Sequence, residues 1–208
     1  MAATRAIPLV MKRAPVERAA AIAAQHGGVV SVKALKKAKV GLVVTGSEVF
    51  HGLIEDKFAP ILSGKVTDLG SEVAGVSFAP DEETLITAAI RNHIDSGCDL
   101  LLLSGGMSVD PDDVTRKAIR MAGAQEVHYG AAALPGAMFL VASIDGIPLL
   151  GVPACGLHHR VTVLDLVLPR ILAGETITRK ELAFIGHGGL CMDCPECSYP
   201  HCPFGKGM

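Results

Sequence analysis

Two glycines followed by aspartates mark the first place where the sequence predicts chemistry. The segment "LLLLSGGMSVDPDDVT", Leu100 to Thr115, is a run of four leucines that ends at Ser104, Gly105 and Gly106. Such a run is typical of a strand buried on both faces. Glycines directly after it let the backbone turn sharply and approach a ligand closely. Backbone N–H groups and hydroxyls just before a helix N-terminus favour an anion such as phosphate.

Asp113 follows this turn, and two interpretations of it stay open. A carboxylate beside a bound phosphate is repelled unless it binds a cation or exchanges a proton with the reacting group. Asp113 could therefore hold Mg²⁺ or act as a general acid or base. Alternatively, Asp112 or Asp113 only caps the helix that follows.

Four cysteines near the end of the chain form a second candidate site. The spacing C-x2-C-x2-C-x4-C comprises Cys191, Cys194, Cys197 and Cys202. Two-residue spacers let successive thiolates face one centre, which suits tetrahedral Zn²⁺ or an iron–sulfur cluster. We expect a metal rather than disulfides, since the chain looks cytosolic. Free thiols are the alternative, and His187 or His201 could replace a cysteine ligand.

These residues are positioned by alternating strands and helices. Predicted strands cover 39–46, 72–80 and the leucine run, and a hairpin within 137–153 turns at Asp145 and Gly146. Predicted helices cover 55–63, 112–121 and 157–172, and a further one is N-capped by Asp81 and stopped by Gly97. The pattern favours an α/β fold whose mostly parallel sheet is sandwiched by helices.

Ligands bind such sheets outside the carboxyl ends of the strands. Three glycine-bearing loops, "TGSEV", "SGGMS" and "GVPACG", fall at those ends and should converge on one edge. The candidate ligand-binding residues are Thr45, Gly46, Ser47, Ser104, Gly105, Gly106, Met107, Ser108, Gly151 and Pro153.

Composition and charge bound the class of protein. The chain has 208 residues, half of them hydrophobic, with 23 glycines and a formal net charge of -2. This balance argues weakly against a nucleic-acid partner. Apolar runs are too short for a membrane span, and a signal peptide is not recognisable. We therefore expect a cytoplasmic protein with neither a nucleic-acid nor a membrane partner.

The charge distribution predicts three parts. Residues 1–39 hold eight Lys and Arg and one acid, whereas 40–126 hold six Lys and Arg and fourteen acids. Residues 1–38 are interpreted as a basic arm or the remnant of a preceding region, with a strand over 5–10 and a helix over 15–28. Residues 39–175 would be the main domain, and 176–208 a cysteine-rich tail.

Four motifs in order resemble the molybdopterin-binding domain shared by MoeA, MogA and the CinA-like proteins. They are "TGSEV", "APD" before a helix, "SGGMSVDPDDVT", and "GVPACG" opening a final helix, and the resemblance covers about 38–175. It implies a three-layer α/β/α domain that forms dimers or trimers. The implied ligand is molybdopterin, a pterin with a dithiolene and a terminal phosphate, or its adenylylated form. Relatives adenylylate that phosphate with ATP or insert the metal from molybdate.

The resemblance also implies roles for single residues. Gly105, Gly106 and Ser108 would cradle the phosphate. Glu48, Asp81 and Asp113 would form an acidic set that is catalytic or binds Mg²⁺, and Asp81 could be an N-cap as well.

Departures from the family pattern leave three functions open. "PACG" stands where the family has "PGN", and "PGAM" lacks the usual lysine, so His158, His159 and Arg160 would have to supply positive charge. The chain lacks the other large parts of MoeA, which suggests a truncated relative. It could be a molybdenum-cofactor biosynthesis enzyme, a molybdopterin carrier or sensor without turnover, or a CinA-like nucleotide pyrophosphatase.

Overall fold

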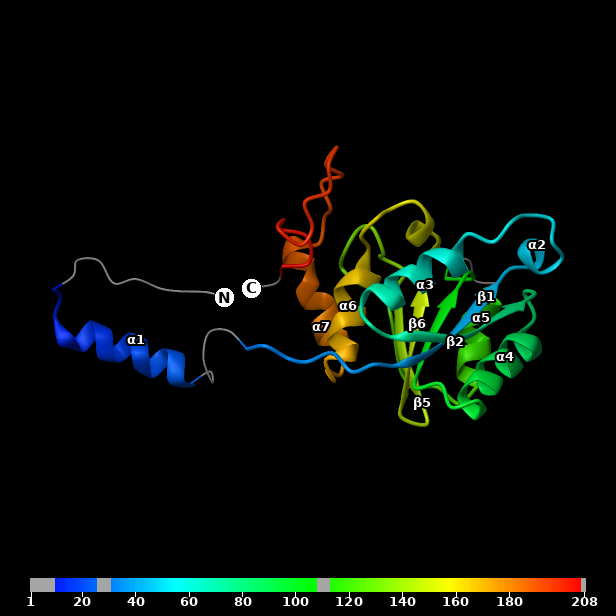
Figure 1. Ribbon diagram of the computed structural model, residues 1–208, viewed down its shortest axis with the longest axis horizontal. Coiled ribbons are helices and arrows are strands. Elements are labelled where there is room, and N and C mark those ends of the chain that lie inside the picture. The colour runs from blue at the N-terminus through cyan, green and yellow to red at the C-terminus, as the bar shows by residue number, and fades with distance from the viewer. Residues whose placement is uncertain (1–9, 26–30, 108–112, 207–208) are drawn as a thin grey trace. The chain divides into compact units, whose positions relative to one another are not determined.

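The computed structural model describes residues 10–25, 31–107 and 113–206 (Figure 1). Contacts divide the chain into two compact units, Met1–Ala34 and Leu35–Met208. The first contains α1 (Arg13–Gln25), which buries none of its residues. This confirms the helix predicted within 15–28, whereas the strand predicted over 5–10 falls, apart from its last residue, outside the described residues.

The second unit is built on one sheet, in which the described residues form six strands in the order β2-β1-β3-β6-β5-β4. The strands are β1 (Lys39–Thr45), β2 (Glu72–Ala79), β3 (Leu100–Ser104), β4 (Gln125–Tyr129), β5 (Leu140–Ile144) and β6 (Ile147–Val152). Strands β2, β1, β3 and β6 are parallel, and β5 runs antiparallel to both β6 and β4. The predicted hairpin is confirmed, with Asp145 and Gly146 both at positive φ in its turn.

The leucine run feeds two hydrophobic cores, one on each face of the sheet. Leu100 and Leu102 pack with α3 (Phe58–Asp68) and α6 (Val163–Leu172). Leu101 and Leu103 pack on the other face with α4 (Glu83–Asp95) and α5 (Val114–Met121). Successive residues of a strand point to opposite faces, so a strand covered on both sides must be apolar throughout. The three-layer α/β/α prediction is confirmed (Figure 1).

Several helix starts differ from the predictions, and at α3 and α6 a local cap explains the difference. Helix α3 begins at Phe58 rather than residue 55, because the Asp56 carboxylate accepts hydrogen bonds from the N–H groups of Phe58 (2.8 Å) and Ala59 (3.0 Å). The final helix begins at Val163, where Thr162 and Asp165 form a capping box; residues Ala154–Leu157 form the short 3-10 turn η1 instead. Helix α4 is preceded by Glu82, so the assignment of Asp81 as its N-cap is wrong.

The elements without a prediction are short or polar. Strand β4 reads "QEVHY" and lies at the sheet edge, where polar side chains remain exposed. Helices α2 (Ser47–Phe50) and α7 (Arg179–Phe184) and the 3-10 turn η2 (Ile185–Gly188) are only one or two turns long.

The cysteine-rich segment is folded onto the second unit. Phe204 is 2% exposed and packs into the core with α6. Leu134 and Leu190 form a β-bridge, in which Leu134 N–H donates to Gly189 O (2.7 Å) and Cys191 N–H donates to Leu134 O (2.8 Å). Across the parts of the chain that the structure describes, every helix is too short or too polar to cross a bilayer.

Candidate functional site

The carboxyl ends of β1, β3 and β6 bring the predicted loops to one edge of the sheet. Val44 pairs with Ser104, and Ser104 pairs with Val152 on its other side. The loops that follow these three parallel strands are therefore neighbours, as the sequence predicts.

The turn at Gly105 and Gly106 accepts no larger residue. Both glycines have positive φ, 88° and 58°. A Cβ on Gly105 would lie 2.3 Å from the Thr45 carbonyl oxygen, and a Cβ on Gly106 would lie 2.0 Å from Thr115 Oγ1. The backbone thus packs against Thr45 and Thr115 more closely than any side chain allows, which fixes the path of the turn.

A layer of buried hydroxyls supports this turn from below. Thr45 Oγ1 donates to Ser104 O (3.1 Å) and lies 3.4 Å from Thr115 Oγ1. Ser104 is fully buried, and its Oγ has no hydrogen-bond partner within the described residues. Of the predicted ligand-binding residues, Thr45 and Ser104 therefore hold the turn from beneath.

A cleft of about 610 Å³, here called the glycine cleft, opens beside the turn. Its described lining is Gly105, Gly106, Met107, Leu134, Pro135, Gly136, Ala137, Met138, Pro153, Ala154, Cys155, His159, Leu190, Cys191 and Asp193. Met107 packs over Gly151, where a Cβ would lie 2.7 Å from the Met107 sulfur. Gly151 therefore acts by leaving room for Met107, while Met107 and Pro153 line the cleft. Burial raises the pKa of the Cys155 thiol above its ordinary value.

A second hollow of about 830 Å³, the acidic cleft, lies at the end of β1. Its described lining is Val44, Thr45, Gly46, Ser47, Glu48, Val49, Ile54, Glu55, Asp56, Lys57, Phe58, Asp81, Leu157 and His158. Asp81 ties the "TGS" turn to the sheet, because its Oδ2 accepts from Ser47 N–H (2.8 Å) and from Ser47 Oγ (2.9 Å). Glu48 and Asp81 thus share one cleft, in agreement with their predicted grouping.

The turn η1 stands between the two clefts. Cys155 and His159 line the glycine cleft, whereas Leu157 and His158 line the acidic cleft. Adjacent residues of one loop therefore serve both clefts.

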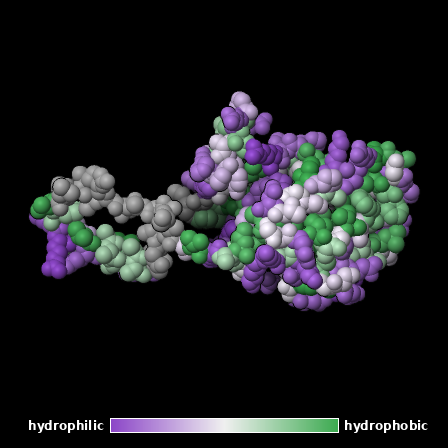
Figure 2. Space-filling model, viewed as in Figure 1, coloured by the Kyte–Doolittle hydropathy of each residue, from purple (hydrophilic) through white to green (hydrophobic). Residues whose placement is uncertain are grey.

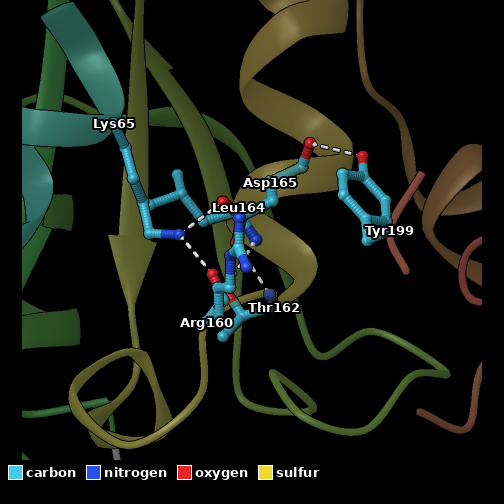
Figure 3. Close-up of polar contacts among 6 residues, drawn as sticks. All are labelled: Lys65, Arg160, Thr162, Leu164, Asp165 and Tyr199. Atoms are coloured by element: carbon cyan, nitrogen blue, oxygen red, sulfur yellow. Dashed lines mark hydrogen bonds and ion pairs between the residues drawn. The ribbon is translucent and has the colours of Figure 1, made fainter. Parts of the chain in front are cut away.

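The loop after η1 is held by a polar network (Figure 3). Lys65 of α3 forms an ion pair with Asp165 and donates to Arg160 O (2.8 Å). Thr162 N–H donates to Asp165 Oδ2 (2.7 Å), which closes the capping box of α6. This network fixes the segment that carries His158 and His159.

Asp113 lies beside the glycine turn and outside the described lining of the acidic cleft. Its Oδ1 accepts from Thr115 N–H (3.0 Å) as the N-cap of α5, so Asp113 caps this helix, and its role in Mg²⁺ binding or acid–base chemistry stays a prediction. It is 8% exposed and would lie 2.9 Å from a Cβ on Gly106. Asp113 is not among the described residues that line either cleft. Ser108, predicted beside it, lies outside the described residues.

Two carboxylates of the acidic cleft, Glu55 and Asp56, were not predicted. The sequence prediction placed both at the start of a helix over 55–63. An aspartate just before an apolar helical pattern is itself a capping signal. Asp56 could therefore have been recognised as a residue at the loop–helix junction, where it faces the cleft.

The four tail cysteines line one small cavity of about 130 Å³. All are free, and Arg160, His158, His159, Asp193 and Tyr199 are among the other residues of its wall. Among the residues that the structure describes, no group of three or more His, Cys, Asp or Glu side chains is placed to hold a metal ion. The thiols are gathered around one space without converging on a point.

Comparison with known families accounts for this layout. Residues 41–173 match the family model described as "Probable molybdopterin binding domain". The chain belongs to the molybdopterin-binding domain family. The match reaches every described strand of the sheet, both clefts and helix α6, and ends before the cysteine-rich segment.

Curated relatives of this family member include CinA-like proteins. Those of Mycolicibacterium gilvum and Mycobacterium tuberculosis (strain H37Rv) are 35% and 33% identical over 82 residues. The match covers 39% of this chain and 19% of each relative, so the matched segment spans about a fifth of their length.

Solved structures confirm the molybdopterin-binding domain fold. MoaB from Thermus thermophilus, described as a molybdopterin biosynthesis enzyme, superposes with a TM-score of 0.55 at 23% identity and covers 66% of this chain and 98% of its own. CinA from Thermoplasma acidophilum gives a TM-score of 0.57 at 14% identity, and the superposition covers 65% of this chain and 98% of CinA. The MoeA protein from Pyrococcus horikoshii gives 0.53 at 26% identity, covering 66% of this chain and 35% of MoeA.

Proposed function

We propose that this domain binds molybdopterin in the glycine cleft, with the terminal phosphate against Gly105 and Gly106, and activates that phosphate from the acidic cleft. The observation that supports the proposal is the adjacency of a tightly packed glycine turn at a strand end and a cleft lined by four carboxylates. The apolar walls of the glycine cleft, with Met107, Leu134 and Leu190, suit the flat pterin ring.

Each cleft would take a different part of the reaction. In adenylyl transfer, an oxygen of the molybdopterin phosphate attacks the α-phosphorus of ATP; a new P–O bond forms and pyrophosphate leaves. Mg²⁺ would neutralise the triphosphate, and it needs only one or two protein carboxylates because phosphates and water complete its shell. Glu48, Asp56 and Asp81 are the candidate ligands. Without a cation, these carboxylates would repel the negatively charged triphosphate of ATP.

Positive charge at the boundary would come from His158 and His159. They would replace the lysine that "PGAM" lacks, and they lie next to the segment held by Lys65 and Asp165. The free thiols of all six cysteines suit a reducing compartment, so we place the reaction in the cytoplasm.

The test is a molybdopterin-dependent release of pyrophosphate from Mg-ATP. The full chain is expected to retain molybdopterin through gel filtration, detected by pterin fluorescence, and to release pyrophosphate only when both substrates are present. Retention without pyrophosphate release, and without molybdate-dependent conversion of adenylylated molybdopterin, would instead identify a carrier or sensor. Loss of retention would overturn the proposal.

A second candidate function is nucleotide pyrophosphatase activity, favoured by the 33–35% identity to CinA-like proteins. ADP-ribose is the substrate that separates the two. Its Mg²⁺-dependent hydrolysis by the full chain, with no retention of molybdopterin, would select this candidate.

We further propose that copies of the second unit associate through an apolar surface next to the acidic cleft. Phe50, Leu53, Ile54, Val76 and Phe78 are between 39% and 75% exposed. They come from α2, the segment after it and strand β2, which α2 contacts. Hydrophobic side chains gather over this end of the unit (Figure 2). Such surfaces are typical of subunit interfaces, which suits the predicted dimer or trimer.

A further inference from the structure

We propose that Cys191, Cys194, Cys197 and Cys202 form a thiolate metal centre whose loading sets the position of one wall of the glycine cleft. The centre would take a thiophilic metal, either Zn²⁺ or iron in an iron–sulfur cluster. The metal centre is supported by the cysteine-rich segment alone. Its effect on molybdopterin binding rests on the proposed function.

The arrangement of the thiols supports a shared centre. The four cysteines lie within twelve residues, and the fold directs all of them to one cavity of about 130 Å³. None is in a disulfide. From Cys191 to Pro203 the chain contains neither helix nor strand, so the side chains can converge when a metal binds. Metal binding commonly completes such sites, because the thiolates are brought together only by the ion.

The segment is pinned at both ends, which limits the entropy that metal binding must remove. Cys191 N–H donates to Leu134 O (2.8 Å) at one end. At the other end Phe204 is buried, and Gly205 N–H donates to Gly188 O (2.8 Å). Between them, Tyr199 Oη donates to the main-chain oxygen of Asp165 (3.3 Å; Figure 3). The thiols therefore lie on a loop whose main chain is held at both ends, and the side chains between these ends line one cavity.

The charge around the cavity matches a thiolate centre. Four thiolates with one Zn²⁺ carry two net negative charges, and iron–sulfur clusters with four thiolates are also anionic. Arg160, His158 and His159 line the same cavity. Cations beside cysteines favour the thiolate form that binds metal.

The thiol cavity and the glycine cleft share a wall. His159, Leu190, Cys191 and Asp193 line both. Cys191 is the first cysteine of the motif, so drawing its sulfur toward a metal moves the residues that face the cleft. The β-bridge between Leu134 and Leu190 carries the same movement to the opposite lining segment. Metal loading and access to the glycine cleft are thus mechanically linked.

The first experiment measures metal in the full chain purified without oxygen. We expect either one zinc ion per chain, or iron and acid-labile sulfide in equal amounts with visible absorption; these two results distinguish the metals. A Cys194→Ser, Cys197→Ser double variant should lose the metal. The matched control is Cys98→Ser, since Cys98 is buried beside His93 on the other face of the sheet. Metal-free protein after reconstitution with zinc and with iron and sulfide, or equal metal in the double variant, would overturn the proposal.

The second experiment tests the linkage without molybdopterin. Cys155 lines the glycine cleft but not the thiol cavity, so its alkylation by iodoacetamide reports access to the cleft. The rate should change at least about threefold between loaded and chelator-treated protein and stay constant in the double variant. An unchanged rate would refute the linkage while leaving the metal centre intact. If the rate changes but molybdopterin is not retained, the linkage stands and the proposed function fails.

Discussion

The two clefts at the carboxyl edge of the sheet differ in the number of carboxylates in their described lining, one in the glycine cleft and four in the acidic cleft. The glycine cleft is made of backbone and apolar side chains around Gly105, Gly106 and Met107, and the cysteine-rich segment closes one side of it. The acidic cleft carries four carboxylates among apolar residues near the "TGS" turn, and Asp81 fixes that turn by two hydrogen bonds. Shape is the limiting property of the first cleft, and charge is the limiting property of the second. Variants that alter one property at a time should therefore separate binding from turnover.

The largest effect is expected from Gly105→Ala. The new Cβ would lie 2.3 Å from the Thr45 carbonyl oxygen at a φ of 88°, so the turn must move. We expect loss of molybdopterin retention and a free energy of unfolding lowered by about 2 kcal/mol or more, measured by denaturant titration.

Gly97→Ala is the matched control for this variant. Its φ is 81°, but a Cβ there meets no atom within 4 Å. This substitution should lower the free energy of unfolding only by the backbone strain, about 1 kcal/mol, and should leave molybdopterin retention unchanged. Equal losses of retention in both variants would show that the tight fit of the glycine turn has no role in binding.

Asp81→Asn should damage turnover more than binding. The amide keeps the size of the side chain but removes the charge that would face Mg²⁺. We expect molybdopterin-dependent pyrophosphate release to fall by about 10²-fold or more, with retention of molybdopterin within about threefold of wild type.

Asp145→Asn removes a carboxylate at the other end of the sheet, in the β5–β6 turn, where it pairs with Arg91 at 2.5 Å. It should leave pyrophosphate release unaffected. If Asp81→Asn instead abolished retention with unchanged turnover per bound ligand, the roles assigned to the two clefts would be reversed.

The sequence predicts the glycine cleft better than the acidic cleft, for a physical reason. A buried leucine run that stops at two glycines predicts a strand, the edge of the sheet where it ends and the turn that follows. Burial on both faces restricts a strand to apolar residues, and positive φ favours glycine in a turn. The carboxylates of the acidic cleft are surface residues, which pattern alone does not restrict. The helical pattern includes Glu55 and Asp56, and the family resemblance predicts Asp81 as an acidic site residue and a possible cap, whereas its carboxylate accepts hydrogen bonds from Ser47.

The tail shows where prediction from sequence stops. The spacing of Cys191, Cys194, Cys197 and Cys202 indicates that the thiols can share a centre, but spacing contains no information on what lies beside them. The contact between Leu134 and Leu190 joins residues more than fifty positions apart. Only the fold reveals that the cysteine segment forms a wall of the glycine cleft.

Phe78→Asp should act on the acidic cleft and spare the glycine cleft. Phe78 is 44% exposed on edge strand β2, within the apolar surface next to α2, which carries Glu48. A charge there should dissociate the proposed oligomer and lower pyrophosphate release several-fold while retention of molybdopterin persists. Light scattering coupled to gel filtration gives the mass, and Leu190→Asp, on the 62% exposed leucine of the glycine cleft, is the contrasting variant. A wild-type protein that is monomeric at all concentrations would refute the interface.

The smallest effect concerns the pH dependence of Cys155, a half-buried thiol in the wall of the glycine cleft. Burial raises the pKa of this thiol, so at neutral pH a smaller fraction is thiolate than in a free cysteine. Because only the thiolate attacks iodoacetamide, alkylation of Cys155 should rise with pH along a curve displaced to higher pH than that of glutathione.

The same burial has a consequence for stability. Cys155 loses its proton more easily in the unfolded chain than in the folded one, so the free energy of unfolding should fall as pH rises past the ordinary thiol pKa. Cys155→Ser should remove that part of the pH dependence. A Cys155 curve that coincides with that of glutathione would mean that the wall of the glycine cleft does not shield this thiol from water, and the proposed contrast between a cleft that acts through shape and one that acts through charge would lose this support.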